Sequence, residues 1–363
     1  MTSAAAVATG RDRDWAIVAL VVAVFALFHE SALAMAARWR DPVNTTYSHG
    51  YLIVALSVWL LWRDRARLRG AFRNARPSAL GATALLLAGL VWLMALWAGI
   101  EFGFTLMLPV VLGLALLAFF GWGVARCCAF AVAYLYFATQ LWDLCNPGAR
   151  WSTIYAVRSA LRLFGIPAYF EGDRIQIPEG TFEIEDGCSG LHFLVVALAL
   201  GALIGELDRS SWKVRLKILA ASLVFALLVN WVRVFAVIIA GHFTHMQHFL
   251  VRVDHRFFGW ALFALALPAL FALVRFLQTP DRTRVADAGS QFVLLRGHGL
   301  GQLLGEAGLE IVLLAKRFLH FDEPLNQLVF FELFVGVVLL EQPAEDFEPG
   351  GKLLERGFGA ARF

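Results

Sequence analysis

Long apolar runs recur along most of this chain and constrain its fold more than any other feature. A helix that crosses the roughly 30 Å hydrocarbon core of a bilayer needs about 20 mostly apolar residues. The sequence predicts about eight such helices, near residues 15–37, 50–62, 79–98, 103–121, 124–144, 189–206, 215–241 and 257–277. Because only helices and closed barrels satisfy their backbone polar groups in lipid, these runs predict an all-α polytopic membrane protein.

The composition agrees with this prediction and excludes other broad classes of protein. Apolar residues make up 60% of the chain and charged residues 16%, whereas soluble domains average about 45–50% and 25%. The net charge of +3 is too small to indicate a nucleic-acid partner. The four cysteines form neither a disulfide framework nor a CxxC pair.

Basic residues in two of the connecting segments predict the orientation in the membrane. Arginine is abundant in residues 63–76, and arginine and lysine recur in residues 209–217. Since such loops remain on the cytoplasmic side, both termini are expected inside. Residues 39–49, 145–187 and 242–256 are then expected on the outside.

Residues 145–187 form the largest predicted exterior segment. Apolar residues at helical spacing, with arginines between them, predict an interfacial amphipathic helix over Trp151–Phe164. Alternating residues in Ala168–Ile177 and Thr181–Ile184 surround a Pro-Glu-Gly turn, which predicts a β-hairpin. This hairpin would lead directly to Cys188 and the sixth transmembrane helix.

The character of the chain changes near residue 279. The apolar runs beyond this point are interrupted by charged residues, and no motif or repeat is found there. We therefore divide the chain into a transmembrane domain, residues 1–278, and an unassigned tail, residues 279–363.

Cys188 is the candidate nucleophile. It is expected to open the sixth helix, where free N–H groups and the helix dipole favour a thiolate. Ser189 and Gly190 follow it, and both are candidates for substrate contact because glycine permits a close approach to the backbone. The alternative, a small buried residue that packs as a hydrophobe, suits the other three cysteines better.

Two polar residues in the seventh predicted helix are expected at the depth of Cys188. Arg233 follows Lys217 by about 16 residues, or roughly 24 Å along a helix. It remains protonated, so it can stabilise an oxyanion or a carboxylate but cannot act as a base. Asn230 lies on the same face and can orient the guanidinium or a substrate carbonyl. The alternative for Arg233 is snorkelling to the interface.

Histidine is the usual base for a thiol nucleophile. His255 stands just before the eighth predicted helix and is the candidate base, whereas His49 has either a structural or a substrate-binding role. The exterior histidines His242, His245 and His248 are three residues apart, but no cysteine or carboxylate joins them at a suitable spacing. We therefore expect no metal and no cofactor.

The chain resembles the exosortase/archaeosortase family in separate motifs that occur in the family's order. They are Cys188-Ser189-Gly190-Leu191, Asn230-Trp231-Val232-Arg233, Val253-Asp254-His255 with Gly259-Trp260, and Tyr47-Ser48-His49-Gly50-Tyr51-Leu52 near the N-terminus. The resemblance covers about residues 15–278. It implies an integral membrane thiol protease or transpeptidase with a Cys/Arg/His site. Carried over to this chain, these residues are Cys188, Arg233 and His255.

The resemblance also implies a substrate and a location. Family members process C-terminal sorting signals of exported proteins, often of the Pro-Glu-Pro type, and bacterial members often accompany exopolysaccharide genes. The partners are then exported proteins and the lipid bilayer. The active site would face the outside of the inner membrane. Some family members carry an extra C-terminal domain, which the tail, residues 279–363, does not match, so the subtype of the sorting signal stays open.

Three functions are consistent with the sequence. In the leading one, Cys188 attacks a peptide bond near the outer membrane boundary, Arg233 stabilises the oxyanion, and His255 activates the thiol and protonates the leaving amine. The second hypothesis is also an enzyme, a plain hydrolase that uses water as the acceptor. A transporter with an intramembrane Arg/Asn site is the alternative from another class, but it should show inverted repeats and broken helices in both halves.

Overall fold

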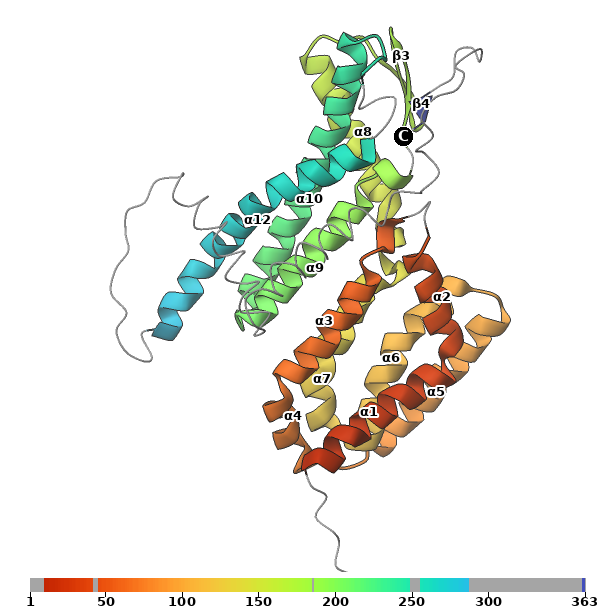
Figure 1. Cartoon of the computed structure of the whole chain (residues 1–363), viewed down its shortest axis with the longest axis vertical. Helices are drawn as coiled ribbons and strands as arrows, with labels where there is room; N and C mark the ends of the chain where they lie inside the picture. Colours follow the sequence, from red (N-terminus) through yellow and green to blue (C-terminus); the bar gives the residue numbers. More distant parts are fainter. Residues whose placement is uncertain (1–9, 42–44, 185, 249–254, 287–360, 363) are drawn as a thin grey trace, which may run out of the picture. The chain divides into compact units, whose positions relative to one another are not determined.

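The computed structural model describes residues 10–41, 45–184, 186–248, 255–286 and 361–362 (Figure 1). Contacts within the chain divide it into two units, Met1–Asp143 and Leu144–Phe363. Most of the predicted tail lies outside the described residues, so the division at residue 278 stays a prediction.

The first unit is helical in its described part. Its elements, with the connecting 3-10 turns, are α1 Gly10–Leu27, α2 His29–Trp39, η1 Thr45–Tyr47, α3 Gly50–Arg63, α4 Arg65–Phe72, α5 Ala79–Trp97, α6 Glu101–Phe120, α7 Trp122–Tyr134 and η2 Leu135–Ala138, followed by η3 Gln140–Cys145 at the boundary between the units. Helix α5 packs along α6. Ser78 caps its N-terminus, and the Ser78 hydroxyl accepts a hydrogen bond from the Gly81 N–H at 3.1 Å.

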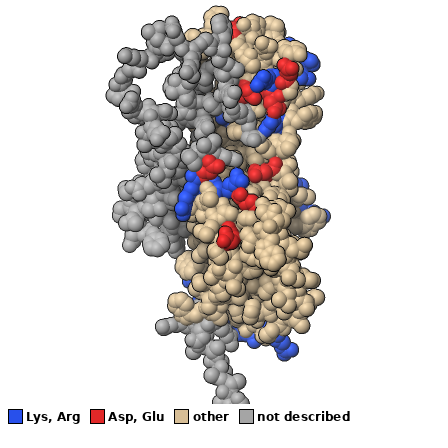
Figure 2. Space-filling view, turned by 90° about the vertical axis from the view of Figure 1, so that its right-hand side faces the viewer, with Lys and Arg blue, Asp and Glu red and all other residues tan. Residues whose placement is uncertain are grey.

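Helix α5 shows what surrounds this unit. Its side chains are mostly unburied, and large apolar residues such as Leu80, Met94 and Trp97 are exposed. The face of the molecule in Figure 2 is likewise mostly uncharged, with charged side chains gathered in a few places. Lipid, rather than water, is the medium that such apolar helical surfaces require.

The second unit combines helices with a small sheet. Its elements are α8 Asn146–Leu163, β1 Tyr169–Glu171, β2 Arg174–Ile177, β3 Gly180–Glu183, η4 Asp186–Cys188, α9 Leu191–Leu207, α10 Trp212–Phe243, α12 His255–Ala286 and β4 Ala361–Arg362. Helix α10 is the centre of the unit, since α8, α9 and α12 all pack against it (Figure 1).

Strands β1, β2 and β3 are antiparallel neighbours, and β4 pairs with β3 in parallel. The predicted strand over residues 168–177 is divided into β1 and β2, because Gly172 adopts a left-handed φ of 58° and turns the chain. Ile175 lies opposite Phe182, and both are buried against α8 and α10.

The helix lengths change the expected number of membrane spans. Among the described residues, four helices are long and apolar enough to cross a membrane. Two further candidates are bent pairs, α1 with α2 at 81° and Trp122–Ala138 with Gln140–Leu163 at 60°, which raises the number to at most six. The expected spans near 50–62 and 189–206 form the shorter helices α3 and α9, with 14 and 17 residues. The structure therefore supports an all-α polytopic membrane protein, but not eight spans.

Candidate active site

Cys188 lies in the 3-10 turn that connects the sheet to α9. It is the last residue of η4, ahead of α9 rather than in its first turn, and its side chain is only 4% exposed. Gly190 follows with a left-handed φ of 90°, and a Cβ there would meet Asn230 Cγ at 2.6 Å. Glycine is therefore needed to bring this turn against α10.

Arg233 projects from α10 toward the thiol. One guanidinium nitrogen, Nη2, lies 3.8 Å from Cys188 Sγ, and the other, Nη1, donates a hydrogen bond of 3.5 Å to Asn230 Oδ1. The guanidinium carbon lies 5.5 Å from the centre of the Phe193 ring of α9, within the range of a cation–π contact. Arg233 is thus a buried cation held beside the sulfur rather than an arginine that snorkels to water.

Asn230 connects Arg233 to the turn that carries Cys188. Its amide nitrogen donates to the Cys188 carbonyl at 3.2 Å and to the Thr153 hydroxyl at 3.0 Å. Thr153 in turn donates to the Ser189 carbonyl at 3.3 Å. All three polar residues, Asn230, Thr153 and Ser189, are fully buried. This network fixes the Cys188 backbone and the Arg233 side chain to the same amide.

The role of Thr153 was not predicted from the sequence. The available signal was its position in α8, four residues before Val157 and eight before Leu161, which are both buried. A hydroxyl on the buried face of an amphipathic helix needs a hydrogen-bond partner. Nothing in the local sequence indicated that this partner would be Asn230, 77 residues away.

Ser189 and Gly190 support the turn in this structure. The Ser189 hydroxyl accepts a hydrogen bond from the Leu191 N–H at 3.2 Å, at the start of α9, and Gly190 packs against Asn230. Their expected contact with substrate remains a prediction.

His255 is the first residue of α12, and its side chain lies outside the described residues. Gly259, one turn later, packs on Arg233, since a Cβ there would meet Arg233 Nε at 2.5 Å. The backbone of this first part of α12 is therefore close to the guanidinium. The role of His255 as a base remains a prediction.

His49 belongs to the first unit, where it precedes α3. Its Nε2 lies 3.1 Å from the Phe137 carbonyl oxygen, and its burial lowers its pKa to about 4. Tyr47, in the same motif, donates a hydrogen bond of 2.7 Å to Asp143. These contacts attach the start of α3 to residues 137–143.

The exterior histidines at the end of α10 contact the sheet. His242 Nδ1 lies 2.8 Å from Glu179 Oε2, and this hydrogen bond holds the pKa of the Glu179 carboxyl below its ordinary value. Within the described part of the chain, no group of three or more His, Cys, Asp or Glu side chains could hold a metal ion.

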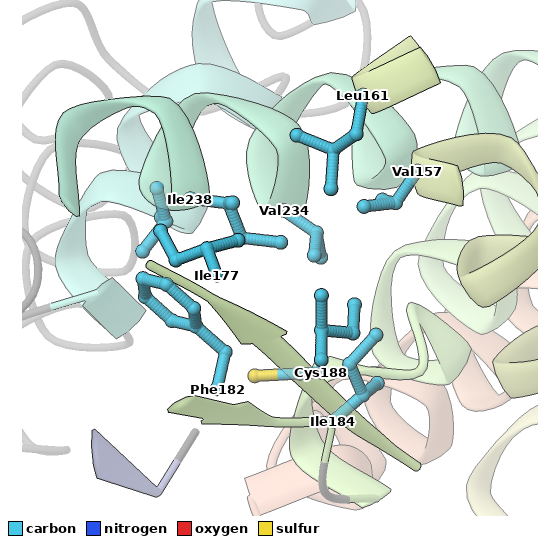
Figure 3. Packing of buried hydrophobic residues seen from close by; sticks show 10 residues of the cluster. Val157, Leu161, Ile177, Phe182, Ile184, Cys188, Val234 and Ile238 are labelled. Carbon is cyan, nitrogen blue, oxygen red and sulfur yellow. The ribbon is translucent and has the colours of Figure 1, made fainter. Parts of the chain in front are cut away.

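The thiol faces apolar side chains. Figure 3 shows the Cys188 sulfur pointing toward Phe182 among aliphatic residues of the sheet and of α10. A small pocket adjoins the sulfur, and it is lined by Phe182, Ile184, Cys188, Arg233, Val234, Val237 and Ile238.

Comparison with known proteins identifies the family. A family model described as transmembrane exosortase matches residues 39–272, which is more than half of the chain. Searches of curated proteins and of solved structures gave no match. The matched range includes Cys188, Asn230, Arg233 and His255, and it confirms the resemblance seen in the sequence. The chain belongs to the transmembrane exosortase family.

Proposed function

We propose that this protein is a membrane-embedded cysteine peptidase or transpeptidase that cleaves C-terminal sorting signals of exported proteins. The observation that carries the proposal is the buried pair of Cys188 Sγ and the Arg233 guanidinium, 3.8 Å apart. A cation next to a thiol favours the thiolate, which is the nucleophilic form of cysteine. Membership of the exosortase family supports the reaction class, the Pro-Glu-Pro type of signal and the link to exopolysaccharide and the cell envelope.

The reaction follows from the chemistry of the three residues. His255 accepts the proton of the Cys188 thiol, and the thiolate attacks the scissile carbonyl carbon and forms a C–S bond while the negative charge moves to the carbonyl oxygen. Arg233 donates hydrogen bonds to this oxyanion. The C–N bond then breaks, and the leaving amine takes a proton from His255. Water or an envelope nucleophile attacks the resulting thioester and releases the processed protein.

Asn230 and Thr153 act as positioning residues in this proposal. Asn230 uses its oxygen for Arg233 and its nitrogen for the Cys188 carbonyl, so it fixes the distance between cation and thiol. Thr153 occupies the same amide nitrogen and keeps the amide in this orientation. Catalytic geometry depends strongly on such support, because a displacement of about 1 Å can cost about 100-fold in rate.

The proposed location is the inner membrane, with the site near its outer boundary. The arginine-rich segment 63–76 and the basic segment 209–217 support this orientation through the positive-inside bias. The proposed topology counts the two short helices α3 and α9 and both bent pairs as crossings, which restores about eight spans.

The transporter alternative has less support. Transporters place substrate sites at helices that are broken at the site. The bent pairs found here do not include α10, and Asn230 and Arg233 both lie within this continuous helix of 32 residues.

The decisive experiment is to trap the acyl-enzyme. The full chain is placed in membranes with an exported reporter that carries a C-terminal sorting tail, and mass spectrometry examines Cys188 for an added acyl group. We expect a thioester on Cys188 and no processing by Cys188→Ala. Cys145→Ala is the control, because this exposed cysteine lies outside the site and should leave processing unchanged. Processing by Cys188→Ala at the normal rate would remove Cys188 as the nucleophile.

A further inference from the structure

The pocket beside the Cys188 sulfur is almost entirely apolar. Apart from Cys188 itself and Arg233, every side chain that lines it is aliphatic or aromatic. Phe182 lies in β3 and Ile184 directly follows this strand. The other three, Val234, Val237 and Ile238, lie on one face of α10. Figure 3 shows the sulfur directed toward Phe182.

The walls of this pocket are held in place. The Phe182 ring is 1% exposed, and it lies against Gly241 of α10, where a Cβ would meet Phe182 Cζ at 2.5 Å. The ring therefore has no room to swing back toward α10. The turn before β3 is attached to the end of the same helix by the hydrogen bond between Glu179 and His242. The sheet and α10 are thus connected on both sides of the pocket, and the pocket cannot widen unless the sheet moves.

We propose that this pocket is the binding subsite for the substrate residue whose carbonyl is transferred to Cys188, and that it selects a small aliphatic side chain there. The inference rests on the proposed function. In the thioester, the carbonyl carbon of that residue is bonded to Sγ, and its Cβ is two bonds further away. The side chain must therefore lie next to the sulfur, where the pocket is.

The chemistry of the wall sets the selectivity. A polar side chain placed there would lose its hydration without gaining a partner, which disfavours it. Arg233 is the one polar side chain in the wall, and it already contacts Asn230 and faces the thiol. A substrate carboxylate that paired with Arg233 would withdraw this donor from the oxyanion. Size is limited by the fixed Phe182 ring, and one methylene too many in such a pocket typically costs about 10- to 200-fold in kcat/KM.

The first test probes the pocket without any substrate. The full chain, with Cys127, Cys128 and Cys145 replaced by Ala, reacts with propyl and 2-hydroxyethyl methanethiosulfonate, which differ mainly in polarity. In each case the Cys188 thiolate forms a disulfide with the reagent's alkylthio group, and methanesulfinate leaves. After correction for the rate with a free thiol, we expect the propyl reagent to react about tenfold faster.

Two variants of α10 connect this rate to the pocket. Val237→Phe fills the pocket and should remove the advantage of the propyl reagent. Val232→Phe is the matched control, because Val232 lies on the same helix but is 56% exposed, so the advantage should persist. Equal rates for the two reagents would overturn the proposal. So would an equal advantage of the propyl reagent in Val237→Phe and Val232→Phe.

The second test uses processing. The cleavage position is identified by mass spectrometry of the processed reporter, and the residue on its acyl side is then changed to Ala, Val, Phe or Asp. We expect Ala and Val to be processed at least tenfold faster than Phe and Asp. Phe182→Leu should reduce the discrimination against Phe, and Val237→Ala gives a second enlargement if Phe182→Leu folds poorly.

The outcomes separate the two proposals. Preferred processing of Phe or Asp, or unchanged preferences in both enlarged variants, would overturn the subsite while Cys188 remained essential. Processing that continued in Cys188→Ala would instead overturn the proposed function.

Discussion

The contacts of the Arg233 side chain indicate its chemical role. Its guanidinium contacts a thiol, an amide oxygen and an aromatic face, and each contact uses a different part of the planar group. An ammonium group is a compact point charge and cannot reproduce these three contacts at once. The arrangement of donors, as well as the positive charge, is therefore expected to matter.

Arg233→Lys should reduce processing almost as strongly as Arg233→Ala. The expected loss of kcat is on the order of 100- to 1,000-fold, the usual cost of removing one oxyanion donor. The rate of reporter processing in membranes measures it, with Arg162→Lys as the control, because Arg162 is an exposed arginine of α8. Substantial activity in Arg233→Lys would mean that Arg233 acts only through its positive charge.

Thr153→Val should lower kcat while the protein stays folded. The substitution keeps the shape but removes the acceptor for the Asn230 amide and the donor to the Ser189 carbonyl. An unsatisfied buried polar group costs about 1–3 kcal/mol, so the orientation of the amide should be lost and kcat should fall roughly tenfold or more.

Thr153→Ser distinguishes positioning from packing. It keeps the hydroxyl and removes only a methyl group, so it should retain most of kcat. Kinetic analysis with separate kcat and KM values, together with the melting temperature, provides the measurement. If Thr153→Ser were as impaired in kcat as Thr153→Val, the methyl contact would be the important one and the positioning role would be wrong.

At the scale of elements, the sheet and α10 form one wall of the candidate site. Strand β3 contributes Phe182 to the core, and the turn before it carries Glu179, which His242 of α10 binds. The short strands bury too little surface to be stable alone. Their position next to Cys188 therefore depends on α8 and α10.

The attachment of the sheet to α10 should weaken in acid. The Glu179 pKa is lowered in the folded protein, first by the hydrogen bond to His242 and further by the charges of His242 and His245. A carboxyl with a lowered folded pKa stabilises the fold above its unfolded pKa, about 4.3, and this contribution is lost as the pH falls through the folded pKa.

Hydrogen exchange of residues 174–183 between pH 3 and pH 7 measures this effect. We expect faster opening, relative to intrinsic exchange, below about pH 4 in the original protein. Glu179→Gln should open faster at neutral pH and show a weaker change with pH. Gln176→Glu serves as a control for an added carboxyl on the exposed side of β2. Identical profiles for the original protein and Glu179→Gln would exclude Glu179 as the attachment.

At the scale of the whole molecule, two properties agree with a multi-pass membrane protein. The apolar helices expose large side chains that lipid must cover, and basic residues are abundant in two connecting segments. The proposed reaction adds a requirement, since exported substrates reach the site only from the outside.

Cysteine labelling in intact cells tests this orientation. In a background without native cysteines, a membrane-impermeant thiol reagent should label Glu171→Cys, next to the turn between β1 and β2. It should label Asn74→Cys and Asp208→Cys only after the membrane is broken. All three positions are exposed, so burial does not explain a difference. If Asp208→Cys were labelled and Glu171→Cys were protected, the orientation in the membrane would be the opposite one. That result would contradict a sorting enzyme.

The sequence by itself determined the family and the class of fold. Apolar runs are local properties of the chain, and the exosortase motifs around Cys188 and Arg233 are short, so both could be recognised without any long-range contact. The same locality explains where the prediction and the structure differ. Hydropathy cannot detect a bend such as the 81° angle between α1 and α2, and it predicted eight spans where the described helices support four to six.

Only the tertiary structure decided which polar groups meet. Asn230 is 42 residues from Cys188 and 77 residues from Thr153, and their hydrogen bonds exist because α8, η4 and α10 pack together. The sequence indicated that Asn230 and Arg233 share a helix face, but it held no sign of Thr153 as a partner or of Phe182 beside the thiol. Such contacts depend on how separate elements pack around a common core, and no short stretch of the chain encodes that arrangement.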